Sequence, residues 1–158
     1  MSKVVTRFAP SPTGTLHIGG VRTALFNYIY AKQHNGNFLV RIEDTDRERS
    51  TKAYEKNILD TLSSIGLSPD KKPINQSERN DIYIKAAEQI IASGGAYWCD
   101  CSEEDLEEMR NQQMADGKKP MYDGRSRDLG LERASNTVLR LATPEDGEIV
   151  MRDMIRGE

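Results

Sequence analysis

Residues 3–42, KVVTRFAPSPTGTLHIGGVRTALFNYIYAKQHNGNFLVRI, decide the fold of this 158-residue chain. The stretch begins with a short apolar strand pattern at 3–8 and continues through a loop of prolines and glycines. From residue 21, apolar residues recur at helical spacing, which predicts a helix that ends near His34. Residues 38–42, FLVRI, are typical of a strand that is covered on both faces. A strand, a helix and a strand in this order predict an α/β fold with a parallel sheet.

The rest of the chain alternates helices with shorter strands. The elements predicted next are helices at 51–65, 81–93 and 102–116 and strands near Ile74 and at 96–100. Residues 117–136 have the composition of a loop, and two alternating stretches, 137–142 and 148–155, predict a hairpin with its turn at 144–147. The stripe of the first helix that should face the core consists of Val21, Ala24, Leu25, Tyr28 and Ile29.

Composition excludes several classes of protein. There are 22 Lys and Arg against 25 Asp and Glu, and the charges are mixed along the chain, which does not suit a basic nucleic-acid coat protein. No apolar stretch approaches the roughly 20 residues of a membrane span, and the N-terminus lacks the apolar core of a signal peptide. Two cysteines are too few to staple a small secreted fold. We therefore expect a cytoplasmic protein without a membrane partner.

A cation and a carboxylate are expected at the same edge of the predicted sheet. Arg7 stands near the end of the first strand, and Glu43 follows the end of the second strand. Ligands of open parallel sheets bind outside the carboxyl ends of the strands. Because Arg binds a carboxylate bidentately and Glu accepts from an ammonium group, the pair suits a zwitterion such as a free amino acid. An ordinary ion pair at the sheet edge is the alternative.

The loop between the first strand and the first helix favours nucleotide binding. Two prolines stiffen it, and Gly14 permits a tight turn. Gly19 and Gly20 lie where the helix starts, and the free N–H groups of a helix start suit phosphate oxygens. His17 lies at the same place and is positioned to donate to a phosphate. The alternative for His17 is a helix cap or a side chain that faces solvent.

Longer blocks of sequence carry a resemblance to a known family. They are RFAPSPTGTLHIGG at 7–20, RTALFNY at 22–28, RIEDTDRERS at 41–50 and QSER at 76–79. These blocks resemble the bacterial glutamyl-tRNA synthetases, which are class I aminoacyl-tRNA synthetases, and His17-Ile18-Gly19-Gly20 stands at the HIGH signature of that family. The resemblance implies the N-terminal half of a Rossmann-like parallel sheet in residues 1–82. An incomplete α+β connective insertion, which binds the acceptor stem, is implied for residues 83–158.

The resemblance also implies roles for single residues. The implied glutamate site consists of Arg7, Ala9, Ser11 and Glu43, with Arg7 facing a substrate carboxylate. The implied ATP site consists of Gly14, His17, Gly19 and Gly20, and His17 and Gly20 stand at the catalytic positions of the signature. The implied reaction is attack by the α-carboxylate of L-glutamate on the α-phosphorus of ATP, followed by transfer to tRNA-Glu. Such a reaction needs positioning and charge stabilisation, and Mg²⁺ travels with the ATP.

Cys99 and Cys101 occupy the place where some members of the family bind structural zinc. In those members a cysteine and a histidine further along the chain complete the site. Here Ser126 and Asp128 stand at those two places. Because serine is a poor zinc ligand, we predict two free thiols and no structural zinc.

The resemblance reaches only the first part of such an enzyme. The second half of the nucleotide fold, the KMSKS loop and the anticodon-binding domains have no counterpart in these 158 residues. We therefore expect an N-terminal portion that binds ATP and glutamate weakly and does not charge tRNA alone. One alternative is a fragment of a glutamyl-queuosine tRNA synthetase paralogue, which activates glutamate but modifies a tRNA base. The other is a noncatalytic binding module without ATP dependence.

Overall fold

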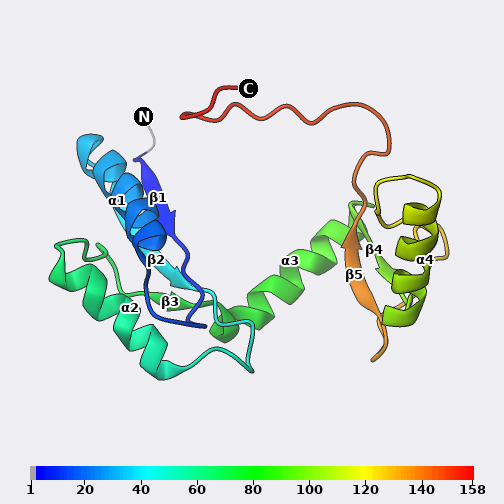
Figure 1. Ribbon diagram of the computed structural model, residues 1–158, viewed down its shortest axis with the longest axis horizontal. Coiled ribbons are helices and arrows are strands. Elements are labelled where there is room, and N and C mark those ends of the chain that lie inside the picture. The colour runs from blue at the N-terminus through cyan, green and yellow to red at the C-terminus, as the bar shows by residue number, and fades with distance from the viewer. Residues whose placement is uncertain (1–2) are drawn as a thin grey trace. The chain divides into compact units, whose positions relative to one another are not determined.

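The computed structural model describes residues 3–158, which form two compact units that meet in sequence between Tyr83 and Ile84. Unit 1 contains β1 (Val5–Phe8), α1 (Ile18–Gln33), β2 (Asn37–Ile42), α2 (Lys52–Ser64), β3 (Ile74–Asn75) and the 3₁₀ helix η1 (Gln76–Arg79) (Figure 1). Helix α3 (Asn80–Ala92) runs across the boundary, and unit 2 contains β4 (Ala96–Cys99), α4 (Glu103–Ala115) and β5 (Val138–Leu141). None of the helices in the described residues is long and apolar enough to cross a membrane.

The sheet of unit 1 is parallel, as the sequence predicts, and its strand order is β1-β2-β3. Arg7 of β1 is the register partner of Leu39 in β2, and Arg41 of β2 is the partner of Ile74 in β3. The carboxyl ends of the three strands therefore lie at one rim, where open α/β sheets bind their ligands. Within residues 3–158, no strand pairs with the outer edge of β1.

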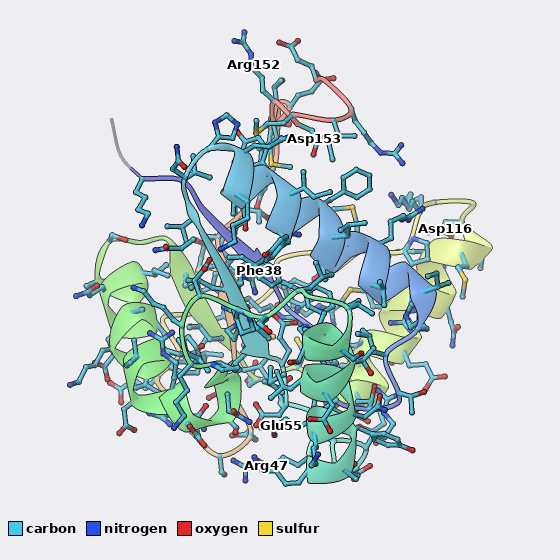
Figure 2. All side chains as sticks on the ribbon, turned by 90° about the vertical axis from the view of Figure 1, so that its left-hand side faces the viewer. Phe38, Arg47, Glu55, Asp116, Arg152 and Asp153 are labelled. Carbon is cyan, nitrogen blue, oxygen red and sulfur yellow. The ribbon has the colours of Figure 1, made fainter. Side chains whose placement is uncertain are left out.

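The core of unit 1 lies between one face of this sheet and helices α1 and α2. Its buried side chains are Phe8, Ala24, Ala31, Phe38, Val40, Ile42, Ile58, Leu62 and Leu67. Every second residue of β2 takes part, so a single face of the strand is buried. Phe38, which is labelled in Figure 2, meets Tyr28 of α1 edge to face, with ring centroids 5.6 Å apart. Burial of a large apolar side chain contributes about 1.5–3 kcal/mol, so this face holds the unit together.

Helix α1 differs in two ways from its sequence prediction. It begins at Ile18, ahead of the apolar pattern, because His17 caps its N-terminus. The predicted stripe was wrong in part, since Leu25 and Ile29 are 42% and 43% exposed. The residues of α1 that are fully buried are Ala24 and Ala31, whose small side chains let the helix pack closely on the sheet.

The turn after α1 brings two backbones unusually close together. Asn35 adopts a left-handed φ of 49°, and the N–H of Gly36 then bonds the carbonyl of Ala31 at 2.7 Å. A Cβ atom on Gly36 would lie 2.3 Å from the carbonyl oxygen of Val4. Only glycine fits there, because that carbonyl accepts from the N–H of Asn37 and starts the pairing of β1 with β2.

The strand pairing in unit 2 differs from the predicted hairpin of residues 137–142 with 148–155. β5 forms within the predicted 137–142, but it pairs antiparallel with β4, with Trp98 opposite Leu139. Residues 148–155 form no strand in the described chain, and an isolated bridge between Asp153 and Gly157 is the only ladder contact there. The hairpin prediction was wrong because alternation identifies a strand face but not its partner.

Helix α4 begins as its sequence predicts. Ser102 Oγ accepts from the N–H of Asp105 at 3.1 Å, and the N–H of Ser102 donates to the Asp105 carboxylate at 2.9 Å. The shorter aspartate therefore completes a capping box in place of the usual glutamate or glutamine.

Candidate functional site

Arg7 and Glu43 meet at the rim of the parallel sheet. Arg7 Nη1 donates to Glu43 Oε1 at 3.2 Å, although the two residues are 36 positions apart in the sequence. Glu43 is the first residue after β2, and Arg7 is the penultimate residue of β1, so parallel pairing brings them together. The contact is the ion pair that the sequence left open as an alternative.

A third charged residue, Arg41, belongs to this site and was missed from the sequence. Arg41 Nη2 donates to the same Glu43 Oε1 at 2.5 Å. Residues 41 and 43 are two apart on an extended segment and therefore point to one face, which was the available signal. We call Arg7, Arg41 and Glu43 the charged frame.

The loop after β1 is held against the start of α2 and the end of β2. Three bonds hold it, from Glu43 N–H to Pro10 O (2.9 Å), from Thr51 N–H to Pro12 O (3.1 Å) and from Leu16 N–H to Asn57 Oδ1 (3.2 Å). The two prolines cannot donate, but both accept through their carbonyls. These three bonds hold the loop from outside and use none of the N–H groups at the start of α1.

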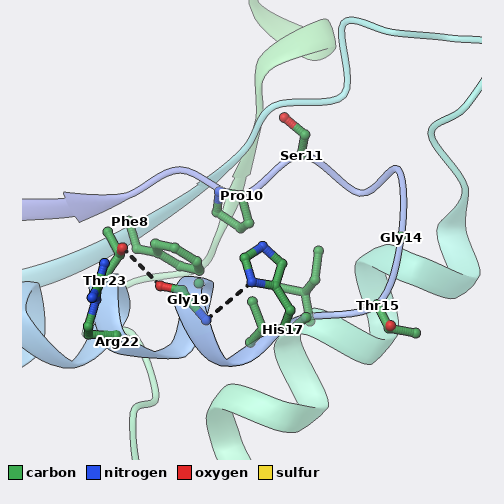
Figure 3. A pocket seen from close by; sticks show the side chains of 12 residues that line it. Phe8, Pro10, Ser11, Gly14, Thr15, His17, Gly19, Arg22 and Thr23 are labelled. Atoms are coloured by element: carbon green, nitrogen blue, oxygen red, sulfur yellow. Dashed lines mark hydrogen bonds between the residues drawn. The ribbon is translucent and has the colours of Figure 1, made fainter.

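A pocket of about 430 Å³ lies between this loop and the start of α1 (Figure 3). We call it the helix-start pocket, and its lining residues are Phe8, Pro10, Ser11, Gly14, Thr15, Leu16, His17, Gly19, Gly20, Arg22, Thr23 and Ile58. The lining includes all four residues of the predicted ATP site together with Ser11. Arg7, Ala9 and Glu43 are not among the lining residues, but the backbone bond from Glu43 to Pro10 joins the charged frame to the pocket wall. Arg22 is a cation of this pocket that the sequence reasoning missed.

His17 caps α1 and still has one nitrogen for a ligand. Its Nδ1 accepts from the N–H of Gly19 at 3.2 Å, as the dashed line in Figure 3 shows. A neutral imidazole that accepts at Nδ1 carries its proton at Nε2. His17 therefore does cap the helix, which was the alternative role expected from the sequence. The cap leaves the proton on Nε2, so the exposed ring can donate a hydrogen bond from that nitrogen.

The three glycines of the pocket differ in how much space surrounds them. A Cβ on Gly19 would lie 2.9 Å from the His17 ring, and a Cβ on Gly20 would lie 2.7 Å from Leu16 Cδ1. A methyl group at either position would therefore displace a neighbouring side chain, the His17 ring or the end of Leu16, but no backbone atom. Gly14 does not adopt a left-handed φ, so its predicted turn does not require glycine, and a Cβ there would meet no atom within 4 Å.

A half-buried carboxylate, Asp44, forms a hydrogen-bond network next to the rim. Asp44 accepts from the N–H and the hydroxyl of Ser77 at 2.9 and 2.6 Å and from Asn75 at 3.3 Å. Burial raises the pKa of Asp44, but the hydrogen bonds from Ser77 and Asn75 outweigh burial, so its pKa is lower than its usual 3.8. The network fastens the segment after β2 to β3 and η1, and no sequence signal singled it out.

The two cysteines of unit 2 lie around one tyrosine hydroxyl. Tyr122 Oη is 3.3 Å from Cys99 Sγ and 3.8 Å from Cys101 Sγ, and it accepts from the N–H of Ser126 at 3.0 Å. Both thiols are free, and Cys101 lies just beyond β4. The Arg140 guanidinium stacks 3.9 Å from the centre of the Tyr122 ring. We call Cys99, Cys101, Tyr122 and Ser126 the thiol cluster.

The electrostatics of the thiol cluster favour an ionised Cys99. Burial raises the pKa of Cys99, but donors on Tyr122, Ser126 and Arg140 lower it from 9.0 to about 6. Burial and the neighbouring Cys99 raise the pKa of Tyr122 to about 12.

The residues present do not fit structural zinc. Zinc sites use four thiolate, imidazole or carboxylate ligands, and this cluster offers two thiols, a phenol and a serine hydroxyl. Asp128 is exposed, and within residues 3–158 no three His, Cys, Asp or Glu side chains are grouped to hold a metal. The predicted lack of zinc stays a prediction.

Solved structures share this fold over nearly the whole chain. A crystal structure of glutamate-tRNA synthetase from Elizabethkingia anophelis matches with a TM-score of 0.86 and 38% identity, covering 99% of this chain and 36% of that one. A glutamate tRNA ligase from Elizabethkingia meningosepticum, in complex with its amino acid, matches with a TM-score of 0.85, 38% identity and the same coverage.

Comparison with protein sequences points to the same family. Glutamate–tRNA ligase from Oleidesulfovibrio alaskensis is 48% identical over 157 residues, and glutamate–tRNA ligase 1 from Alkalilimnicola ehrlichii is 51% identical over 159 residues. The chain spans about a third (34%) of the length of each relative. The family model described as tRNA synthetases class I (E and Q), catalytic domain, matches residues 3–158. The chain therefore belongs to the class I tRNA synthetases for glutamate and glutamine, within their catalytic domain.

Proposed function

We propose that this chain is the N-terminal part of a glutamate–tRNA ligase, a cytoplasmic enzyme that uses ATP to join L-glutamate to tRNA-Glu. The observation that carries this proposal is the charged frame, which lies beside the helix-start pocket and is joined to it through Pro10. The curated relatives are glutamate–tRNA ligases, which favours this reading over the glutamyl-queuosine paralogue.

Each part of the site has a role in the proposal. Arg7 binds the side-chain carboxylate of glutamate, Glu43 accepts from its α-ammonium group, and Ala9 and Ser11 complete that site. The helix-start pocket holds ATP, which brings Mg²⁺ with it.

Charge on the ATP phosphates is met by three groups that line one pocket. They are the N–H groups where α1 begins, other than that of Gly19, the Nε2–H of His17 and the guanidinium of Arg22. The chemical step is attack by the α-carboxylate on the α-phosphorus with release of pyrophosphate, followed by transfer to tRNA. These residues act by holding the two substrates in line and by stabilising phosphate charge.

We further propose that residues 1–82 are the first half of a Rossmann-like catalytic domain and that residues 83–158 belong to an acceptor-stem-binding insertion. The strand order β1-β2-β3, with the candidate site at the carboxyl rim, supports the first assignment. Within the described residues, the outer edge of β1 has no partner and α1 and α2 cover one face of the sheet. The 158-residue chain alone therefore binds its small substrates weakly and does not activate glutamate.

ATP binding is the first test, and α1 provides a matched pair of variants. His17 precedes the helix and His34 follows it, so His17→Asn and His34→Asn make the same chemical change at opposite ends. Asparagine is a good N-cap, so His17→Asn keeps the cap but removes the Nε2–H donor. We expect MgATP to shift the amide resonances of residues 14–20 and His17→Asn to weaken binding about fivefold to tenfold. His34→Asn should bind as the wild type does.

Two results would contradict the proposal. If MgATP does not shift the amide resonances of residues 14–20, and the chain binds a partner independently of ATP, the noncatalytic binding module is favoured. Glutamate-dependent exchange of pyrophosphate into ATP at the rate of a complete synthetase would show that 158 residues are enough for activation.

A further inference from the structure

Glu43 has more positive charge around it than one carboxylate needs. Oε1 of Glu43 accepts from both Arg7 and Arg41, and neither guanidinium has another hydrogen bond or ion pair within residues 3–158. The frame therefore contains two cations and one anion. A group of this kind attracts a ligand with one net negative charge.

The two guanidiniums are not equivalent. Arg41 lies two residues before Glu43 in the chain, its bond is the shorter at 2.5 Å, and its side chain is 28% exposed. Its Nε is enclosed and has no hydrogen-bond partner among the described residues, so the side chain has little room to reorient. Arg7 reaches Glu43 from the neighbouring strand at 3.2 Å and is 45% exposed. Arg7 is thus the cation that can leave, and Arg41 is the one that stays.

We propose that Arg41 is a positioning and specificity-determining residue for glutamate, an inference that rests on the function proposed above. Arg41 keeps Glu43 oriented and compensated when Arg7 turns from Glu43 to the side-chain carboxylate of the substrate. The α-ammonium group then takes the place that Arg7 has left on Glu43. No bond is made or broken in this exchange, which trades one charged partner for another.

Charge matching then distinguishes glutamate from glutamine. Free glutamate carries one net negative charge at neutral pH and neutralises the frame, whereas glutamine is a neutral zwitterion. Without Arg41, Arg7 is the sole cation on Glu43, and its departure leaves a carboxylate paired only with the incoming ammonium. Loss of Arg41 should therefore weaken binding of glutamate more than binding of glutamine.

The test measures the dissociation constants of L-glutamate and L-glutamine for the 158-residue chain by NMR titration into the millimolar range. Arg41→Gln removes the charge, Arg41→Lys keeps it, and Arg47→Gln is a matched control. Arg47 is exposed in the segment after β2 and forms no ion pair within the described residues (Figure 2). We expect Arg41→Gln to lower the ratio of the glutamine Kd to the glutamate Kd about tenfold, the size of one charge-assisted contact. Arg41→Lys should restore at least a third of that ratio, and Arg47→Gln should leave it within a factor of two.

The outcomes separate this inference from the proposed function. If Arg41→Gln weakens both ligands equally, Arg41 has a structural role only and the inference is overturned, while the glutamate site stands. If Arg41→Gln behaves as Arg47→Gln does, the inference is overturned in the same way. If glutamate causes no shifts at Arg7 and Glu43 in the wild-type chain, the proposed amino-acid site fails and the inference fails with it.

Discussion

Unit 1 and unit 2 are stabilised by different kinds of core. Unit 1 buries a continuous apolar cluster between a parallel sheet and two helices. Unit 2 buries few large apolar side chains, and its two-stranded sheet adjoins the thiol cluster, in which sulfur, phenol and hydroxyl groups contact one another. One chain therefore combines two kinds of core. The stability of the first depends on how much apolar surface is buried, and that of the second depends on individual polar contacts, so the loss of a single atom can lower it.

Removing the central aromatic of unit 1 should have the largest effect. Phe38 is completely buried, and Phe38→Ala should cost about 3–5 kcal/mol through lost transfer energy and a cavity. The single tryptophan, Trp98, lies on β4, so its fluorescence reports unit 2 separately. We expect rapid amide exchange in β1 and β2 but an unchanged urea midpoint for Trp98. Phe26→Ala is the control, since Phe26 is 59% exposed on α1 and should cost less than about 0.5 kcal/mol. An equal loss of both transitions would show one cooperative core.

Removing one oxygen atom should have the next largest effect, this time in unit 2. Tyr122→Phe leaves Cys99 and the N–H of Ser126 without their shared partner and should cost about 1–3 kcal/mol in the Trp98 transition. Tyr97→Phe makes the same change at a ring that stacks with Arg127 and has no hydroxyl hydrogen bond among the described residues, so it should be near neutral. If the two variants unfold at the same urea concentration, the polar contacts do not hold unit 2.

The smallest effect should come from the Asp44 network and should depend on pH. Because the pKa of Asp44 is lowered in the folded chain, its stabilisation is complete above the usual value of 3.8 and is lost as the pH falls through the lowered pKa. Asp44→Asn should therefore cost about 1–2 kcal/mol at pH 7 and nothing at pH values below the lowered pKa. Asp60→Asn, which removes an exposed ion pair to Lys56, should cost less than about 0.5 kcal/mol. A penalty for Asp44→Asn that is the same at both pH values would mean that the charge of Asp44 does not matter. Urea titrations of the wild type and of Asp44→Asn, at pH 7 and at a pH below the lowered pKa of Asp44, measure this loss of stability.

The sequence predicted the parts of the fold that depend on local patterns. Helix ends at Thr51, Ser102 and His34, the parallel pairing of β1 with β2 and the meeting of Arg7 with Glu43 all follow from neighbours along the chain or from one crossover. The partner of β5 did not follow, because β4 lies far away in sequence and alternation does not encode pairing.

Contacts across elements were missed at the site for the same reason. The bonds from Ser77 and Asn75 to Asp44 join segments that no periodicity relates. The exposure of Leu25 was missed because helical spacing shows that a stripe exists but not how wide the contact with the sheet is. Arg41 could have been found, since it is the penultimate residue of β2 and lies two residues before Glu43.

The close approach at Gly36 has a consequence at the opposite end of the two strands. An added methyl group would push on the Val4 carbonyl, and the first rung between β1 and β2 would shift with it. The same ladder continues to the pairs of Arg7 with Leu39 and Phe8 with Val40, and Glu43 follows the end of β2, so a displacement at the turn would propagate along the two strands to the contact at the rim. The turn at Gly36 therefore sets the spacing between Arg7 and Glu43 in the proposed amino-acid site, although Gly36 lies at the other end of the two strands.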